Sequence, residues 1–290
     1  MTVRVEVLTD HLISSTLSFT TMSASSSSLL VAWQLKDKRV LVVGGGEVAA
    51  GRVESVLCAQ ALITILSPLK GLHLRTKELI MQHPDRITHY DRRFSGPSEL
   101  HKMDMVLVAI DDVNRSHEIV DHCRQVKIPV NAADLPDHCD FYFGAQIRDG
   151  PLQIMISTSG NGPRMAALIK ATLQKALTGN EGIAVAKVGQ LREKLKERAS
   201  GVGGVVSRKR MKWMTQLCDT WDMQDFCLLD DATQIKLLNV GWEQGRIPTA
   251  EEITGRRRWP TISRSCLLPS AVGFAMGAVC TALVILSRRR

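Results

Sequence analysis

Closely spaced cysteine pairs are absent from this chain of 290 residues, and their absence argues against a disulfide-stabilised protein and against a zinc finger. The seven cysteines are an odd number, and no two of them form a Cys-x-x-Cys pair. A disulfide framework needs an even set of cysteines and a zinc finger needs closely spaced ligand pairs. We therefore expect reduced thiols and no bound structural metal.

Acidic residues are missing from the end of the chain, and this absence explains most of the formal net charge of +8. Seven arginines and no acidic residue follow Glu252. Residues 35–160, in contrast, hold 15 Lys+Arg and 16 Asp+Glu. The positive excess therefore belongs to the tail, and we expect no nucleic-acid partner, because binding one needs a basic face on the folded part.

The first segment has no regular hydrophobic pattern. Residues 1–30 are rich in Ser and Thr, which predicts a disordered leader. A secretory signal is not indicated, since no basic segment precedes an apolar core. A mitochondrial presequence is disfavoured, because Arg4 is the only basic residue beside the acidic Glu6 and Asp10. Met22 is an alternative start.

Three consecutive glycines mark the first functional motif. Residues 39–50, RVLVVGGGEVAA, are typical of a strand, a tight turn and a helix. They fit G-x-G-x-x-[G/A], in which Gly44 permits the turn, Gly46 lets the backbone approach a pyrophosphate, and the helix start offers free N–H groups. We predict a dinucleotide site here. The alternative is a strand-to-helix turn without a ligand.

Strand patterns alternate with helix patterns through the first half of the chain. Apolar runs stand at residues 61–66 and 105–110, residues 87–90 form a short predicted strand, and a further strand begins at Val130. This order predicts an α/β fold with a Rossmann-like, doubly wound parallel sheet, which we place at residues 31–144.

Two of these strand ends bear on the cofactor. The strand at residues 61–66 is not followed by the acid that normally binds the ribose, so we expect backbone groups and Ser67 to hold it. Asp111 follows the strand at residues 105–110, at the edge where open α/β sheets bind ligands. The choice between NAD and NADP is therefore open at this point.

Residues 130–144, VNAADLPDHCDFYFG, place Asn131, Asp134 and two further aspartates beside three aromatic residues. Apolar surroundings can raise the pKa of a carboxylate toward the range of a general base. The same residues could instead form Asx turns over an aromatic core. Residue types alone leave both interpretations open.

Hydroxyl groups follow the next predicted strand, at residues 152–156. Ser157, Thr158 and Arg164 could bind substrate carboxylates through hydroxyl and guanidinium groups. The alternative is that they cap a helix that begins at Pro163.

Four motifs occur in one order along the chain: LKDK at 35–38, GGGEV at 44–48, NxADxPxxCDFYFG at 131–144 and ISTxGxxPR at 156–164. Together they resemble sirohaem synthase of the fungal type, the family of precorrin-2 dehydrogenases that are usually also sirohydrochlorin ferrochelatases. The resemblance implies hydride transfer from precorrin-2 to NAD+, followed by insertion of Fe2+, a substrate, to give sirohaem. It assigns Asp134 as the proton acceptor in both steps.

The resemblance also maps cofactor contacts onto the residues after the glycines and after the second strand. With the residues singled out above, the predicted cofactor site comprises Gly44, Gly45, Gly46, Glu47, Val48, Ser67, Pro68, Leu69 and Asp111. The predicted tetrapyrrole contacts are Asn131, Ser157, Thr158 and Arg164.

One departure from the family concerns histidine. Some fungal members carry a histidine in the C-terminal helical domain, but none follows His138 here, and residues 223–227 offer Asp225 and Cys227 instead. A dehydrogenase without chelatase activity is therefore one alternative. A non-catalytic, membrane-attached NAD-binding protein is a second, which the retained Asp134 and the glycine motif disfavour.

Apolar residues recur at helical spacing in the second half of the chain. The predicted helices span residues 164–177, 183–198, 205–221 and 230–242. The spacing alone predicts only a core. The resemblance implies a segment at residues 145–180 that forms a homodimer, followed by a small all-α domain at residues 181–255.

The last segment is unusual for that family. Residues 266–286 contain no charged side chain, and arginines flank them on both sides. At about 1.5 Å per residue, a helix of this length matches a hydrocarbon core of about 30 Å. We predict a transmembrane tail anchor that holds a cytosol-facing enzyme on the mitochondrial outer membrane or the endoplasmic reticulum. The alternative is a buried core helix.

Overall fold

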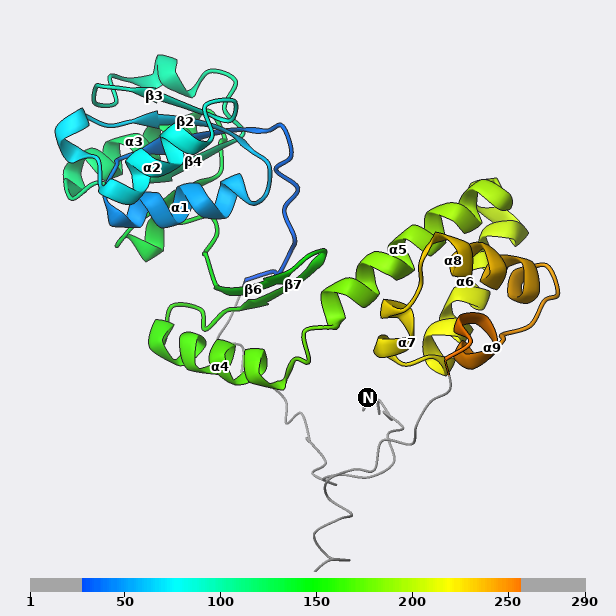
Figure 1. Cartoon of the computed structure of the whole chain (residues 1–290). Coiled ribbons are helices and arrows are strands. Elements are labelled where there is room, and N and C mark those ends of the chain that lie inside the picture. The colour runs from blue at the N-terminus through cyan, green and yellow to red at the C-terminus, as the bar shows by residue number, and fades with distance from the viewer. Residues whose placement is uncertain (1–27, 257–290) are drawn as a thin grey trace, which may run out of the picture. The chain divides into compact units, whose positions relative to one another are not determined.

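The computed structural model describes residues 28–256, whose elements are shown in Figure 1. The chain forms two compact units: the first runs to Ala145 and includes Met155–Ala171, and the second comprises Gln146–Ile154 and the residues from Thr172 onward. Most of the predicted leader and the whole predicted membrane helix at 266–286 lie outside the described residues. Between residues 28 and 256, no helix has both the length and the apolar composition that crossing a membrane requires.

A five-stranded parallel sheet is the framework of the first unit, and it confirms the predicted Rossmann-like architecture. Its strands, in the order β3-β2-β1-β4-β5, are β1 (Arg39–Val43), β2 (Leu62–Leu66), β3 (Ile87–Tyr90), β4 (Met105–Val108) and β5 (Val130–Ala132). The register pairs Val43 with Leu66 on one side and with Val108 on the other. The carboxyl ends of the three central strands therefore lie in line.

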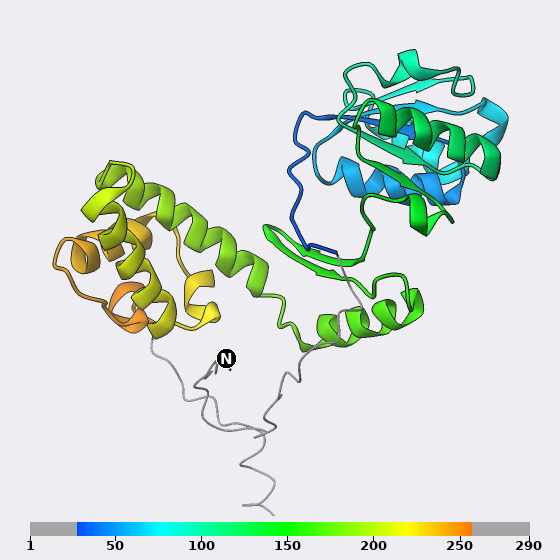
Figure 2. The same ribbon diagram turned by 180° about the vertical axis from the view of Figure 1, so that it is seen from behind.

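Helices cover both faces of this sheet, as Figures 1 and 2 show from opposite sides. The helices are α1 (Glu47–Leu57), α2 (Leu74–Gln82) and α3 (Val113–Gln125), and the short turns are η1 (Leu69–Gly71), η2 (Pro97–Leu100) and η3 (Pro136–His138). Val40 and Val42 of β1 belong to the core that contains α1 and α2 residues, whereas Leu41 and Val43 belong to the core that contains α3 residues. Burial on both faces explains why the central strands are continuous apolar runs.

A two-stranded sheet and a long helix follow. The strands are β6 (Ala145–Asp149) and β7 (Leu152–Ile156), and the helix is α4 (Pro163–Ala176). The bounds of β7 agree with the prediction, whereas β6, with the mixed sequence AQIRD, showed no strand signal. Ala166 is the only residue of α4 that is buried.

The helical part comprises α5 (Glu181–Arg198), α6 (Gly204–Thr220), α7 (Met223–Cys227), α8 (Asp231–Leu237), a π-helical turn η4 (Leu238–Trp242) and α9 (Ala250–Thr254). Its core contains three tryptophans, and the indole N–H groups of Trp213 and Trp221 donate to backbone carbonyls 3.0 and 2.9 Å away. The predicted helix at 230–242 is confirmed in its extent, but its last turn differs: α8 ends at Leu237 and continues without a break as the π-helical η4 to Trp242. Gly241 lies in the π turn, where an added Cβ would come within 3.0 Å of Trp213.

Candidate active site

The turn after β1 needs its first two glycines for reasons internal to the fold. Gly44 has φ +118°, and a Cβ there would lie 2.0 Å from the carbonyl oxygen of Ala109. A Cβ on Gly45 would lie 2.5 Å from Ser67 Oγ. Both positions therefore exclude a side chain whether or not a ligand binds.

Gly46 is different, because nothing in the protein requires it to be a glycine. Its φ of −70° suits any residue, and an added Cβ would meet no atom within 4 Å. Gly46 is also the N-cap of α1, and no side chain caps the helix. The first-turn N–H groups and the open space beside them suit the approach of an anion, so these residues fit the pyrophosphate of a dinucleotide.

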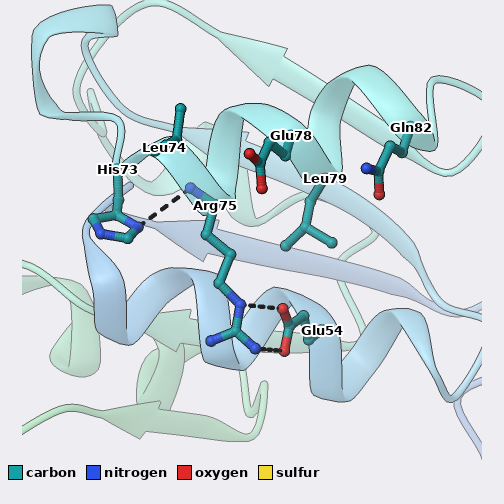
Figure 3. A pocket seen from close by; sticks show the side chains of 7 residues that line it. All are labelled: Glu54, His73, Leu74, Arg75, Glu78, Leu79 and Gln82. Carbon is teal, nitrogen blue, oxygen red and sulfur yellow. Dashed lines mark hydrogen bonds and ion pairs between the residues drawn. The ribbon is translucent and has the colours of Figure 1, made fainter.

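Contacts from the start of α2 hold the glycine turn in place, and no sequence pattern indicated them. The Gly45 carbonyl accepts hydrogen bonds from His73 N at 2.8 Å and from the buried Thr76 Oγ1 at 2.9 Å. Figure 3 shows how Arg75 ties α2 to α1 through a two-point ion pair with Glu54. A cavity of about 340 Å³ adjoins this pair, and no predicted site residue lines it.

The turn after β2 places its predicted cofactor contacts in different environments. Ser67 is only 3% exposed and packs against the glycine turn, so burial disfavours a direct ribose contact by its hydroxyl. Pro68 is half-buried and Leu69 is exposed. The Leu69 N–H group already donates to Asp91 Oδ1, 2.7 Å away, so this backbone donor has a partner within the protein.

Two neighbouring acidic residues follow the end of β4, and one of them caps the next helix. Asp112 caps α3, because its Oδ1 accepts a hydrogen bond from Arg115 N at 3.0 Å. Asp111 is exposed beside it. The strand itself ends at Val108, two residues earlier than predicted, and the Ala109 carbonyl then faces Gly44.

Asp134 lies on the loop that follows β5, with an exposed side chain and φ +59°. Left-handed backbone is costly for most residues but is tolerated by Asp and Asn. The loop therefore has a specific shape at the residue to which the sequence assigned proton transfer.

The buried Asn131 and the half-buried Cys139 hold this loop from inside. Asn131 is 3% exposed, and its Nδ2 donates to the Phe141 carbonyl at 2.8 Å. Cys139 Sγ accepts from Ala132 N at 3.3 Å and lies 3.3 Å from the Leu135 carbonyl oxygen. Burial raises the pKa of the Cys139 thiol, so it stays a neutral donor. The burial of Asn131 and its hydrogen bond to the Phe141 carbonyl favour a role in positioning the loop over the predicted substrate contact.

Two of the three aromatic residues of the same stretch pack against the core, whereas Tyr142 is exposed. Phe141 and Phe143 pack against the apolar cluster beneath α1, and Trp33 meets Phe141 edge-on with ring centroids 5.6 Å apart. The Arg52 guanidinium carbon lies 4.1 Å from the centroid of Phe143. Phe141 and Phe143 therefore pack as the second interpretation expects, and the catalytic role of Asp134 stays a prediction.

The hydroxyls after β7 take part in a capped turn. Ser157 Oγ accepts from Ser159 N at 3.2 Å, and Thr158 Oγ1 accepts from Gly162 N at 3.3 Å. Each hydroxyl accepts in this turn, so its own hydrogen can still be donated. Arg164, in the first turn of α4, is exposed.

The sheet brings most of the predicted site to one edge. The glycine turn, the turn after β2, Asp111 and Asp134 all follow carboxyl ends of the five-stranded sheet. The strand order reverses between β1 and β4, and ligands of open α/β sheets bind at such a switch point. Ser157, Thr158 and Arg164 instead follow the separate β6–β7 sheet.

Comparison with known proteins supports this arrangement. Residues 31–145 match an NAD(P)-binding family, residues 149–176 the central region of sirohaem biosynthesis proteins, and residues 179–248 their C-terminal region. The chain is 42% identical over 228 residues to a siroheme biosynthesis protein of Schizosaccharomyces pombe, covering 78% of this chain and 84% of that one. The chain belongs to the sirohaem biosynthesis family.

Other sirohaem proteins agree over different lengths. A siroheme biosynthesis protein of Saccharomyces cerevisiae is 30% identical over 258 residues, which cover 75% of this chain and 92% of that protein. A siroheme synthase of Psychrobacter is 30% identical over 59% of this chain, but only 34% of that longer protein is matched. The solved structure of SirC, a precorrin-2 dehydrogenase, covers 73% of this chain and 98% of its own with a TM-score of 0.58 at 22% identity, which shows the shared fold.

The resemblance described above leads us to expect a histidine in the helical part, and in residues 223–227 the chain has Asp225 and Cys227 instead. Asp225 is 6% exposed, and its Oδ2 accepts from Asp222 N at 3.0 Å in the capping box of α7. Cys227 Sγ lies 3.4 Å from the Asn180 carbonyl oxygen. Both side chains therefore stabilise the helical core. Between residues 28 and 256, no group of three or more His, Cys, Asp or Glu side chains could hold a metal ion.

Proposed function

We propose that this chain makes sirohaem: it oxidises precorrin-2 to sirohydrochlorin with NAD+ and then inserts Fe2+. The observation that carries the proposal is the open, uncapped start of α1 at Gly46, at the same sheet edge as Asp134. The first feature suits a dinucleotide and the second supplies an exposed carboxylate. Membership in the sirohaem biosynthesis family identifies the tetrapyrrole as substrate.

The dehydrogenation removes a hydride and a proton from precorrin-2. NAD+ supplies the hydride acceptor when it is bound. The N–H groups at the start of α1 hold the pyrophosphate, and Asp134 accepts the proton at its carboxylate. Ser157, Thr158 and Arg164 are proposed to bind substrate carboxylates by hydrogen bonds and charge.

Iron insertion is the second proposed step, and it releases two protons from the pyrrole N–H groups of sirohydrochlorin. Asp134 can accept these protons in turn. The alternative is a dehydrogenase that leaves iron to another protein. The absence of a histidine after His138 favours this alternative, and Asp225 and Cys227 are engaged in contacts of the helical part.

The deciding experiment incubates the purified full-length chain in detergent with precorrin-2, NAD+ and Fe2+ and records absorption spectra over time. NADH formed together with the sirohaem spectrum establishes both activities on one chain. NADH formed while sirohydrochlorin accumulates identifies a dehydrogenase only. Absence of NADH, with intact substrate, contradicts the proposed function.

We also propose that α4 pairs two copies of this chain, within a dimerisation segment at residues 145–180. Met165, Ile169 and Leu173 recur at helical spacing, and 56%, 41% and 38% of their respective surfaces are exposed. An apolar stripe of this kind is typical of a helix that packs against a partner. Residues 181–255 remain proposed as a separate helical domain.

A charged substitution in this stripe should separate the two copies. We expect Ile169→Glu to convert the dimer to a monomer, because a carboxylate would be buried against an apolar partner. Light scattering after size-exclusion chromatography measures the mass directly. Gln174→Glu adds the same charge on an exposed position of α4 and should leave the dimer intact. A monomeric wild-type protein would refute the pairing.

The final proposal concerns residues 266–286, which we propose as a tail anchor in the mitochondrial outer membrane or the endoplasmic reticulum. Deleting residues 260–290 should release an active enzyme into the supernatant, because the deletion removes the uncharged segment and keeps residues 28–256, which contain the predicted site. Carbonate extraction followed by centrifugation of cell membranes measures the distribution of both forms. Continued sedimentation of the truncated protein with membranes would refute the anchor.

A further inference from the structure

The ribose position after β2 carries no acid of its own. In dinucleotide-binding sheets an Asp or Glu about 20 residues after the glycine motif binds the ribose hydroxyls and disfavours the 2′-phosphate of NADP. In this chain that position is Ser67, which is buried. Ser67 therefore offers no negative charge for the ribose hydroxyls.

The neighbouring strand supplies a carboxylate instead. The register pairs Leu66 with Tyr90, so Asp91 stands beside Ser67 as the next residue of each chain segment. Three contacts join the two strand ends: Ser67 N donates to the Tyr90 carbonyl at 3.3 Å, His89 Nε2 lies 2.8 Å from the Ser67 carbonyl oxygen, and Leu69 N donates to Asp91 Oδ1 at 2.7 Å. The last contact directs the Asp91 carboxylate toward the turn after β2.

The geometry points to Asp91 as the residue that binds the adenosine ribose hydroxyls of NAD and selects against NADP. This inference rests on the proposed function, since it assumes a dinucleotide at the glycine turn. Asp91 is exposed, and Oδ1 is held by Leu69 N while Oδ2 remains to accept from a ribose hydroxyl. A phosphate at the 2′ position would meet this carboxylate with like charge.

Two other observations bear on the sign of the selectivity. Arg92, the next residue, is engaged away from the turn: its Nη1 donates to Glu99 Oε1 at 2.6 Å, and its guanidinium lies over the Tyr90 ring. Lys70 and Arg93 are exposed cations on the same two segments, and they would attract a phosphate. Asp91 is the only acidic side chain of residues 67–71 and 90–93, so its charge is the one that opposes this attraction.

The test measures dissociation constants of NADH and NADPH by nicotinamide fluorescence on the full-length protein, without tetrapyrrole. Asp91→Asn keeps the oxygen that accepts from Leu69 N but removes the charge. We expect about tenfold weaker NADH binding, tighter NADPH binding, and an unchanged melting temperature. Asp91→Ser, which opens more space for a phosphate, should shift the ratio in the same direction.

The matched control is Asp85→Asn, which makes the same change just before β3, at the amino end of the strand that Asp91 follows at its carboxyl end. The side chain of Asp85 is 75% exposed and lies 3.8 Å from Arg86, so its loss should leave both constants unchanged. An NADH-to-NADPH ratio that does not change in either Asp91 variant overturns the inference while the dinucleotide site stands. A wild-type protein that binds neither cofactor overturns the proposed function as well.

Discussion

Asp134→Asn is expected to lower the rate of precorrin-2 oxidation by about 10²–10⁴-fold, the usual contribution of a general acid–base group. An amide has nearly the size of the carboxylate but cannot accept the proton. Asparagine also tolerates the left-handed backbone at this position, whereas alanine would add strain. NADH formation from precorrin-2, followed by absorbance, measures the loss, and iron insertion into supplied sirohydrochlorin should fall in parallel.

Two measurements show whether this effect is chemical. Thermal melting and NADH binding should be the same in Asp134→Asn as in the wild type, because the side chain is exposed. Asp137→Asn, an exposed aspartate on the same loop, should retain nearly full activity. Normal turnover by Asp134→Asn would remove Asp134 from the mechanism.

The second large effect is expected at Gly46. Gly46→Asp should weaken NADH binding more than about 100-fold, since its carboxylate would occupy the open space in front of α1 and repel the pyrophosphate. Aspartate is a favoured N-cap residue, so the same change should leave the melting temperature unchanged or raise it. A position where the favoured residue abolishes binding without loss of stability is the signature of a ligand site.

The controls for Gly46 are a glycine of the following helix and another glycine of the same turn. Gly51→Asp, at another open position of α1, should bind NADH normally. Gly44→Ala should destabilise the fold itself, because its Cβ would lie 2.0 Å from the Ala109 carbonyl oxygen. Iron insertion into supplied sirohydrochlorin should survive Gly46→Asp. Wild-type NADH affinity in Gly46→Asp would leave the glycine turn as a structural turn only.

The sheet could be predicted because its signals are local. Central strands buried on both faces appear as short apolar runs, as β1 and β4 do. The half-exposed strands β3 and β7 also have the predicted bounds. The glycine motif likewise combines a strand, a turn and a helix start within a dozen residues. Helix α2 was missed, since Leu74 and Met81 are exposed and obscure its apolar stripe.

The parts that could not be predicted depend on contacts between distant residues. Asp91 and Leu69 are 22 positions apart, and only the strand register brings them together. The loop that carries Asp134 is likewise shaped by the thiol of Cys139, for which we predicted no role, and by the amide of Asn131, which we predicted as a substrate contact. Neither contact leaves a periodic pattern in the sequence.

The central position of β1 has a consequence for the order in which the protein matures during synthesis. A ribosome releases β1, β2 and β3 first, and these strands are adjacent on one side of the sheet. The other side of β1 pairs with β4, which is synthesised later. The carbonyl that packs against Gly44 belongs to Ala109, just after β4. The nascent chain therefore cannot complete the packing of its glycine turn until more than 60 further residues have emerged after the glycines.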